Sequence, residues 1–188
     1  SFVTTPSCSF YAKEVGCLGA LVITASHNPY NWLGLKIKSF NGCSVDESFT
    51  SEIEKRLMLG NSIEKIDGVN QLVDIKKFHL DRIKSLFDID FISNRLKKMK
   101  LRIFVDSMHG SAANCMAEIF ASNDLEVISE IRKDADPFFG GKPPEPLLNY
   151  VDDLNQILMK NSTNEVKTLG IIFDGDGDRI AAIDEKGR

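Results

Sequence analysis

The sequence LGIIFDGDGDRIAAID spans residues 169–184 and consists of two strand-like runs separated by an acidic turn. LGIIF has the short apolar pattern of a strand buried inside a sheet, and RIAAID resumes a strand pattern after the turn. Upstream, LRIFVD at 101–106 and LEVIS at 125–129 have the same character. Helical patterns are expected at 111–122 and 147–159, with a Gly/Pro-rich loop at 136–146. Alternation of strand and helix predicts an α/β layer.

A second unit of the same kind precedes this one. LGALVIT at 18–24 predicts a short buried strand, and GLKIKS at 34–39 alternates apolar with polar residues as a second strand does. A helix is expected at 45–57 and a longer one at 74–98. We therefore expect an α/β fold of two consecutive α/β units, each a mixed β-sheet flanked by helices, covering residues 1–97 and 98–188.

Composition narrows the class of protein. The 188 residues are 43% hydrophobic and 27% charged, with a formal net charge of -4. These values are ordinary for a soluble globular protein and give no electrostatic reason to expect nucleic acid or an anionic membrane as a partner. The four cysteines are scattered without a C-x-x-C pair, which predicts reduced thiols in a cytoplasmic protein.

The acidic turn is the first candidate functional site. Asp174, Asp176 and Asp178 alternate with glycines directly after an apolar strand. Glycine lets the backbone curl, so that the three carboxylates can converge. Their mutual repulsion calls for a cation, and hard oxygen ligands favour Mg²⁺ or Ca²⁺. A metal site is therefore expected here, in preference to a solvated hairpin turn.

Two other classes of protein share parts of this pattern. In an EF-hand, Asp174, Asp176, Asp178 and Glu185 would fill positions 1, 3, 5 and 12, but Arg179 stands where glycine is required. A non-catalytic Ca²⁺-binding module would use this set. Haloacid dehalogenase-type phosphatases also place Asp-x-Asp after an apolar strand. In that hypothesis Asp174 is the nucleophile and Asp176 the acid/base.

The second candidate site is the loop TASHNP, residues 24–29, directly after a predicted strand. Ser26 at a strand end, in a polar loop turned by proline, is well placed for exposed chemistry. Ser26 and His27 are adjacent, and neighbouring side chains diverge, so they do not form a hydrolase dyad.

TASHNP followed by GLKIK, with DGDGDR far downstream, resembles the α-D-phosphohexomutase superfamily of phosphoglucomutases and phosphomannomutases. The resemblance covers nearly the whole chain, as the later part of domain 1 and most of domain 2. It implies that Ser26 is the phosphoserine and a ligand of Mg²⁺, together with Asp174, Asp176 and Asp178. Lys36 matches an active-site lysine of the family, and FGGKPPEP at 139–146 resembles a Pro-rich loop without an established chemical role.

The same resemblance implies an intramolecular phosphotransferase. Phosphoserine would convert a hexose monophosphate into a hexose 1,6-bisphosphate and take the other phosphate back, so that 1-phosphate and 6-phosphate interconvert. Arg179, always cationic, could balance anions or hold the phosphate. His27 or Lys36 could take the proton of the sugar hydroxyl, and the family favours Lys36. Leu33 stands where the family usually has asparagine.

Three further features receive plainer interpretations. His79 is expected to be a packing or surface histidine, and His109 to serve a turn or approach the cleft. Gly140, Gly141 and Lys142 lack phosphate-loop spacing and are expected to be part of a shaped loop. The chain itself is expected to be a fragment, with further C-terminal domains as its partners, weak metal binding and little turnover of its own.

Overall fold

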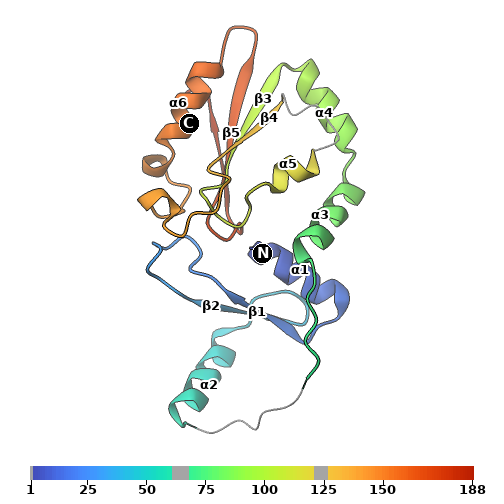
Figure 1. Cartoon of the computed structure of the whole chain (residues 1–188), viewed down its shortest axis with the longest axis vertical. Coiled ribbons are helices and arrows are strands. Elements are labelled where there is room, and N and C mark those ends of the chain that lie inside the picture. The colour runs from blue at the N-terminus through green and yellow to red at the C-terminus, as the bar shows by residue number, and fades with distance from the viewer. Residues whose placement is uncertain (1, 61–67, 121–126) are drawn as a thin grey trace.

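The computed structural model describes residues 2–60, 68–120 and 127–188 (Figure 1). The first part of the chain forms a two-stranded antiparallel sheet and two helices. These elements are α1 (Thr5–Val15), β1 (Gly19–Ile23), β2 (Leu35–Ser39) and α2 (Glu47–Met58). Asp46 caps α2 by accepting a hydrogen bond from the backbone N of Phe49, which explains why the helix begins where its sequence pattern does.

The second part of the chain forms a four-stranded sheet with helices on both faces. Its elements are α3 (Ile75–Leu86), α4 (Ile89–Lys98), β3 (Leu101–Asp106), α5 (Cys115–Ile119), β4 (Ile128–Ile131), two 3₁₀ turns (Phe139–Gly141 and Leu148–Tyr150), α6 (Asp152–Asn161), β5 (Lys167–Phe173) and β6 (Ile180–Asp184). The expected α/β class is confirmed. This sheet is mixed, as expected, whereas the first sheet, which was also expected to be mixed, is antiparallel among the described residues.

Strand order in the second sheet is β4-β3-β5-β6. β3 pairs in parallel with β4 and β5, whereas β5 and β6 form an antiparallel hairpin around the acidic turn. Parallel pairing brings the carboxyl ends of β3 and β5 to one edge, with Asp106 opposite Ile172. The loops after these two strands therefore lie side by side, facing the first sheet (Figure 1).

The core lies on both faces of the second sheet, because side chains alternate along each strand. Ile103 and Val105 of β3 pack in one cluster with apolar residues of α3, α4 and α5. Phe104 points the other way, into a cluster with Leu154 and Leu158 of α6. α3 and α4 thus pack on the second sheet, although the expected boundary near residue 97 leaves them in the first unit. That boundary stays a prediction.

Helix α1 joins the two parts. Phe10 and Tyr11 contact Phe78 of α3 with ring centroids 5.7 and 5.2 Å apart, and Phe10 stacks on His79 at 5.1 Å. No helix or strand is expected from the sequence at residues 1–17. The sequence nevertheless has the two signals of a helix start, a threonine at the N-cap position and a proline in the first turn. In the structure the side chain of Thr4 accepts a hydrogen bond from the backbone N of Ser7.

Three expected helices have different bounds. The helix expected at 74–98 is two helices, because Phe87 is extended and Asp88 caps α4 with its side chain. The helix expected at 111–122 is reduced to α5, since Asn114 has a positive φ of 63° just before it; residue 122 lies outside the described residues. The helix expected at 147–159 is a 3₁₀ turn followed by α6, with Val151 non-helical between them.

Two expected strands also differ. The strand expected at 125–129 is observed as β4, at 128–131, and residues 125 and 126 lie outside the described ranges. β1 has the sequence of a buried strand, but Leu21 and Ile23 are 70% and 75% exposed and only Val22 is buried. The reason is that β1 pairs with β2 alone, and no described element covers the face carrying Leu21 and Ile23.

In the part of the chain that the structure describes, no helix has both the length and the apolar composition that crossing a membrane requires.

We expect Leu154→Ala to lower the free energy of unfolding by about 2–5 kcal/mol, because the side chain is fully buried and its removal leaves a cavity. Met159→Ala on the same helix is the control: Met159 is 67% exposed, so the change should stay within about 0.5 kcal/mol. Urea denaturation of both variants measures the difference, and equal losses would contradict the observed orientation of α6.

Candidate active site at the meeting of two loops

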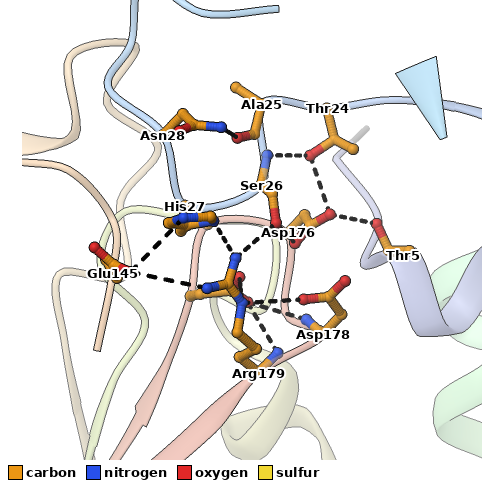
Figure 2. A network of polar contacts seen from close by, with 12 residues as sticks. Thr5, Thr24, Ala25, Ser26, His27, Asn28, Glu145, Asp176, Asp178 and Arg179 are labelled. Carbon is orange, nitrogen blue, oxygen red and sulfur yellow. Dashed lines mark hydrogen bonds and ion pairs between the residues drawn. The ribbon is translucent and has the colours of Figure 1, made fainter. Parts of the chain in front are cut away.

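Ser26 lies in the loop between β1 and β2, in a left-handed backbone conformation with φ of 55°. The hydroxyl of Thr24 accepts a hydrogen bond from the backbone N of Ser26 at 2.8 Å. Asn28 closes the loop, since its backbone N and its side-chain Nδ2 both donate to the carbonyl of Ala25 at 3.0 Å (Figure 2). These local bonds hold a conformation that a serine otherwise avoids.

The acidic turn connects β5 to β6. Asp174 folds back over it, and its Oδ1 accepts hydrogen bonds from the backbone N of Asp178 at 3.0 Å and of Arg179 at 3.1 Å. Asp174 and Asp176 are buried, and Asp178 is more exposed. One carboxylate oxygen from each of the three aspartates lies within 4.8 Å of the other two.

Glycine is required between the first two aspartates by close packing. A Cβ on Gly175 would lie 2.4 Å from the carbonyl oxygen of Ser26 and 2.8 Å from Cγ of Pro144. The backbone N of Gly175 also donates to the carbonyl of Pro144 at 3.0 Å. The serine loop and the Pro-rich loop therefore both contact the acidic turn through its backbone.

The two candidate loops meet through polar side chains. Ser26 Oγ donates to Oδ1 of Asp176 at 3.3 Å. Lys36 Nζ donates to Oδ2 of Asp176 and to Oδ2 of Asp178, both at 2.7 Å, and to Ser26 Oγ at 3.3 Å. The structure thus places the lysine that follows Ser26 by ten residues between the serine and two of the carboxylates.

Arg179 is a second cation beside Ser26. Its guanidinium donates to Ser26 Oγ at 3.1 Å and to Nδ1 of His27, and its Nε lies 3.2 Å from Oδ2 of Asp174. Because a guanidinium only donates, Nδ1 of His27 is the acceptor in this contact. Figure 2 shows Glu145 beside both residues, 3.7 Å from His27 and 3.9 Å from Arg179.

Burial and charge pull the pKa values of these groups apart. Burial raises the pKa of Asp174 above its ordinary value, although backbone donors and Arg179 oppose it. Burial would also raise the pKa of Asp176, but hydrogen bonds from Lys36, Thr5 and Thr24 outweigh it and lower that pKa. Burial acts to lower the pKa of Lys36, yet its bonds to Asp176 and Asp178 raise it. Lys36 is therefore an ammonium donor at neutral pH.

The donor set fits a hard divalent cation. Oδ2 of Asp174 is buried and accepts no hydrogen bond from the described residues, although it forms an ion pair with Nε of Arg179 at 3.2 Å. A buried carboxylate oxygen without a donor costs free energy unless a cation satisfies it. Three carboxylates and the hydroxyl of Ser26 offer the oxygen ligands that Mg²⁺ prefers.

All seven residues predicted from the sequence to belong to the site are brought together; they are Ser26, His27, Lys36, Asp174, Asp176, Asp178 and Arg179. Their catalytic roles stay predictions. Glu185 is not part of the carboxylate group found among the described residues and lies 3.8 Å from Lys167 instead. This observation argues against the EF-hand arrangement.

The remaining candidates have structural partners. His79 accepts or donates a hydrogen bond at 2.7 Å with Ser7 and stacks on Phe10. Nδ1 of His109 is hydrogen-bonded to the carbonyl oxygen of Asp134 at 2.8 Å. His109 also lines a cavity of about 620 Å³, together with Ser26 and Asp176. The backbone N of Gly140 donates to Asp136, so this loop is shaped by its own hydrogen bonds.

Three residues beside the site were missed by the sequence analysis: Thr5, Thr24 and Glu145. Thr5 and Thr24 donate from their hydroxyls to Oδ2 of Asp176 at 2.6 and 3.1 Å. Thr24 and Glu145 stand within the TASHNP and FGGKPPEP motifs, so the motifs were a signal for them. Thr5 had none beyond its place after a helix N-cap, because its partner is 171 residues away.

The two parts of the chain match consecutive domains of one protein family. Residues 1–62 match the family model described as phosphoglucomutase/phosphomannomutase, alpha/beta/alpha domain I, and residues 77–187 match the model of domain II of the same family. A phosphoglucosamine mutase of Methanococcus vannielii is 32% identical over 99% of the chain, and phosphoglucomutase-2 of Paramecium tetraurelia is 28% identical over 94%.

The fold has a solved counterpart. A crystal structure from Thermus thermophilus, assigned to the phosphomannomutases, superposes on the chain with a TM-score of 0.82 and is 25% identical in sequence. The superposition covers 98% of this chain and 40% of the Thermus thermophilus chain. The chain spans about two fifths of the length of the curated relatives that it matches, 40% and 38% for the two named above.

Asp176→Asn should remove a pH-dependent part of the stability. Because the folded protein lowers the pKa of Asp176, its ionised form stabilises the fold above the unfolded value of about 3.9, and this contribution is lost as the pH falls through the folded pKa. At pH 7 we expect a loss of about 1.5–3 kcal/mol, the size of hydrogen bonds to a charged group.

The measurement is urea denaturation of the parent protein and Asp176→Asn between pH 7 and pH 3. The difference between the two should shrink below about pH 4. A difference that stays constant over this range would contradict the assigned ionisation.

Proposed function

The chain belongs to the phosphoglucomutase/phosphomannomutase family, and we propose that its protein is a magnesium-dependent phosphohexomutase that carries the phosphoryl group on Ser26. Such an enzyme is an isomerase that acts as an intramolecular phosphotransferase, interconverting hexose 1-phosphate and hexose 6-phosphate. The names of the relatives include glucosamine and glucose phosphate mutases, which supports a hexose phosphate as substrate.

One observation carries the proposal: Ser26 Oγ is hydrogen-bonded at once to a carboxylate of the acidic turn and to two cationic side chains. An unmodified serine needs no such surroundings. A phosphorylated one has a charge of about -1.5 to -2 and three acceptor oxygens, which Arg179 and Lys36 are placed to bind. The carboxylates would hold the cation needed to bring that dianion so close to them.

The proposed reaction has two halves. The Oγ–P bond of phosphorylated Ser26 breaks while a bond forms between phosphorus and a hydroxyl oxygen of the hexose monophosphate. The hydroxyl proton passes to a base, and the serine oxygen takes up a proton. After the bisphosphate has turned around, its other phosphate returns to Ser26 by the reverse step. The net change is the exchange of 1-phosphate for 6-phosphate.

Residues of this chain would bind and orient the groups. Asp174, Asp176, Asp178 and Ser26 would hold Mg²⁺, which withdraws negative charge from phosphoryl oxygens. Arg179, fixed between Asp174 and Ser26, would donate to the phosphate. Lys36 donates to Ser26 in the structure, and its raised pKa suits a donor better than a base.

The family assignment of Lys36 as the proton acceptor stays a prediction. His27 is the neighbouring alternative, because its ring contacts Arg179, which also donates to Ser26 Oγ.

The alternatives have less support. A phosphatase that uses Asp174 as nucleophile needs that carboxylate to reach a substrate, but Asp174 is fully buried and its Oδ1 holds the turn together through two backbone bonds. A Ca²⁺-binding module would need Glu185 as a ligand, and Glu185 lies outside the carboxylate group.

The activity of the whole protein goes beyond this chain. The chain covers about two fifths of the relatives' length. We therefore propose, for the whole protein, a hexose phosphate substrate, the use of a hexose 1,6-bisphosphate and a contribution from further domains. Little turnover by these 188 residues alone, and a cytoplasmic location, stay predictions.

We expect the purified protein to take up a phosphoryl group on Ser26 when it is incubated with Mg²⁺ and a hexose 1,6-bisphosphate. Peptide mass mapping should find the added phosphate on the peptide that contains Ser26. Ser26→Ala should lose it, whereas Ser44→Ala should keep it, because Ser44 is an exposed serine bonded to Lys38. Phosphate retained by Ser26→Ala would contradict the proposal that Ser26 carries the phosphoryl group.

Asp174→Asn should weaken the binding of Mg²⁺ by more than about 100-fold, since changes to residues that only support ligands already cost 10- to 100-fold. Isothermal titration calorimetry measures the affinity. Asp184→Asn is the matched control: Asp184 also accepts backbone hydrogen bonds at the end of a strand of the same hairpin, but away from the turn. If both variants lost affinity equally, the acidic turn would not be the metal site.

A further inference from the structure

Thr5 contacts the acidic turn twice. Its backbone N donates to the carbonyl of Asp176 at 2.9 Å, and its hydroxyl donates to Oδ2 of the same residue at 2.6 Å. Thr5 is 2% exposed and Asp176 is 5% exposed. A hydrogen bond from a hydroxyl to a carboxylate is charge-assisted and about twice as strong as a neutral one. Shielding from water preserves this strength.

The residues around Thr5 hold it in place. Thr4 caps α1, and its hydroxyl lies 2.7 Å from the hydroxyl of Ser7. Ser7 in turn lies 2.7 Å from Nδ1 of His79 on α3. A row of polar contacts therefore runs from α3 into the first turn of α1. Thr5 stands between this row and the acidic turn.

The two oxygens of Asp176 have unequal partners. Among the described residues, Oδ2 accepts from Thr5, Thr24 and Lys36, whereas Oδ1 accepts only the 3.3 Å bond from Ser26. The Thr5 bond is the shortest of the four and comes from the most buried donor. It fixes the rotation of the carboxylate, so that Oδ1 stays directed at Ser26.

We propose that Thr5 is a positioning residue of the metal site, whose hydroxyl orients Asp176 for a divalent cation shared with Ser26. The inference rests on the proposed function, since the cation is the one expected there. The orientation of Asp176, a metal ligand of the second unit, would then depend on Thr5 of α1 in the first unit. Metal affinity would therefore depend on the contact between the two units. Thr5 would act only through Asp176.

Thr5→Val tests the role of the hydroxyl. Valine fills the same space, and the backbone bond to Asp176 remains. We expect Mn²⁺, used as a paramagnetic probe in electron paramagnetic resonance titrations of the purified protein, to bind about 10- to 100-fold more weakly. Thr5→Ser keeps a hydroxyl and should restore most of the affinity, which a purely structural role would not require.

Thr168→Val is the matched control. Thr168 is 3% exposed and its hydroxyl donates to the carbonyl of Leu158 at 3.1 Å, so the variant also loses a buried hydrogen bond, but away from the turn. It should lower the free energy of unfolding in urea while leaving Mn²⁺ affinity unchanged. Equal losses of affinity in Thr5→Val and Thr168→Val, or unchanged affinity in Thr5→Val, would overturn the inference.

Peptide mass mapping of the same proteins, after incubation with Mg²⁺ and a hexose 1,6-bisphosphate, separates the two proposals. If Ser26 is phosphorylated and Thr5→Val binds Mn²⁺ like the parent protein, the role of Thr5 is wrong and the mutase function stands. If Ser26 stays unmodified while Thr5→Val binds Mn²⁺ weakly and Thr5→Ser normally, the role of Thr5 is supported and the mutase function fails.

Discussion

The arrangement of this molecule depends on one buried carboxylate. Asp176 comes from the acidic turn of the second unit. In the part of the chain that the structure describes, the four side chains that donate to its carboxylate all come from the first unit: Thr5, Thr24, Ser26 and Lys36. Its backbone carbonyl accepts from Thr5 as well. The two parts of the chain are thereby joined at the proposed active site. The geometry of the site therefore depends on the contact between the two units.

Opposing electrostatic effects act on the carboxylates of the site. Burying Asp174 and Asp176 next to each other is unfavourable, and burial raises the pKa of Asp174. Lys36 and Arg179 offset this cost from two sides, one between Asp176 and Asp178 and the other against Asp174. A phosphoryl group on Ser26 would add negative charge at the same place, which is why a divalent cation fits the arrangement so well.

The secondary structure could be predicted where the pattern was strong and local. LRIFVD, GLKIKS and LGIIF all form strands, and the helix that follows Asp46 begins where its cap indicates. Helix interruptions at Phe87 and Asp88 and at Val151 were missed, because each spans only one or two non-helical residues inside an apolar pattern of helical period. The exposure of β1 could not be predicted, since burial depends on what covers a strand and not on its own residues.

The sequence by itself determined which residues could do the chemistry. Ser26, Lys36 and the aspartates of DGDGDR stand in two local motifs whose residue types and spacing already point to phosphoryl and metal chemistry. Only the tertiary structure decided that these motifs meet, that Asp174 is buried while Asp178 is not, and that Thr5 belongs with them. The physical reason is that a motif records local geometry, whereas a hydrogen bond across 171 residues arises only when helices and sheets pack.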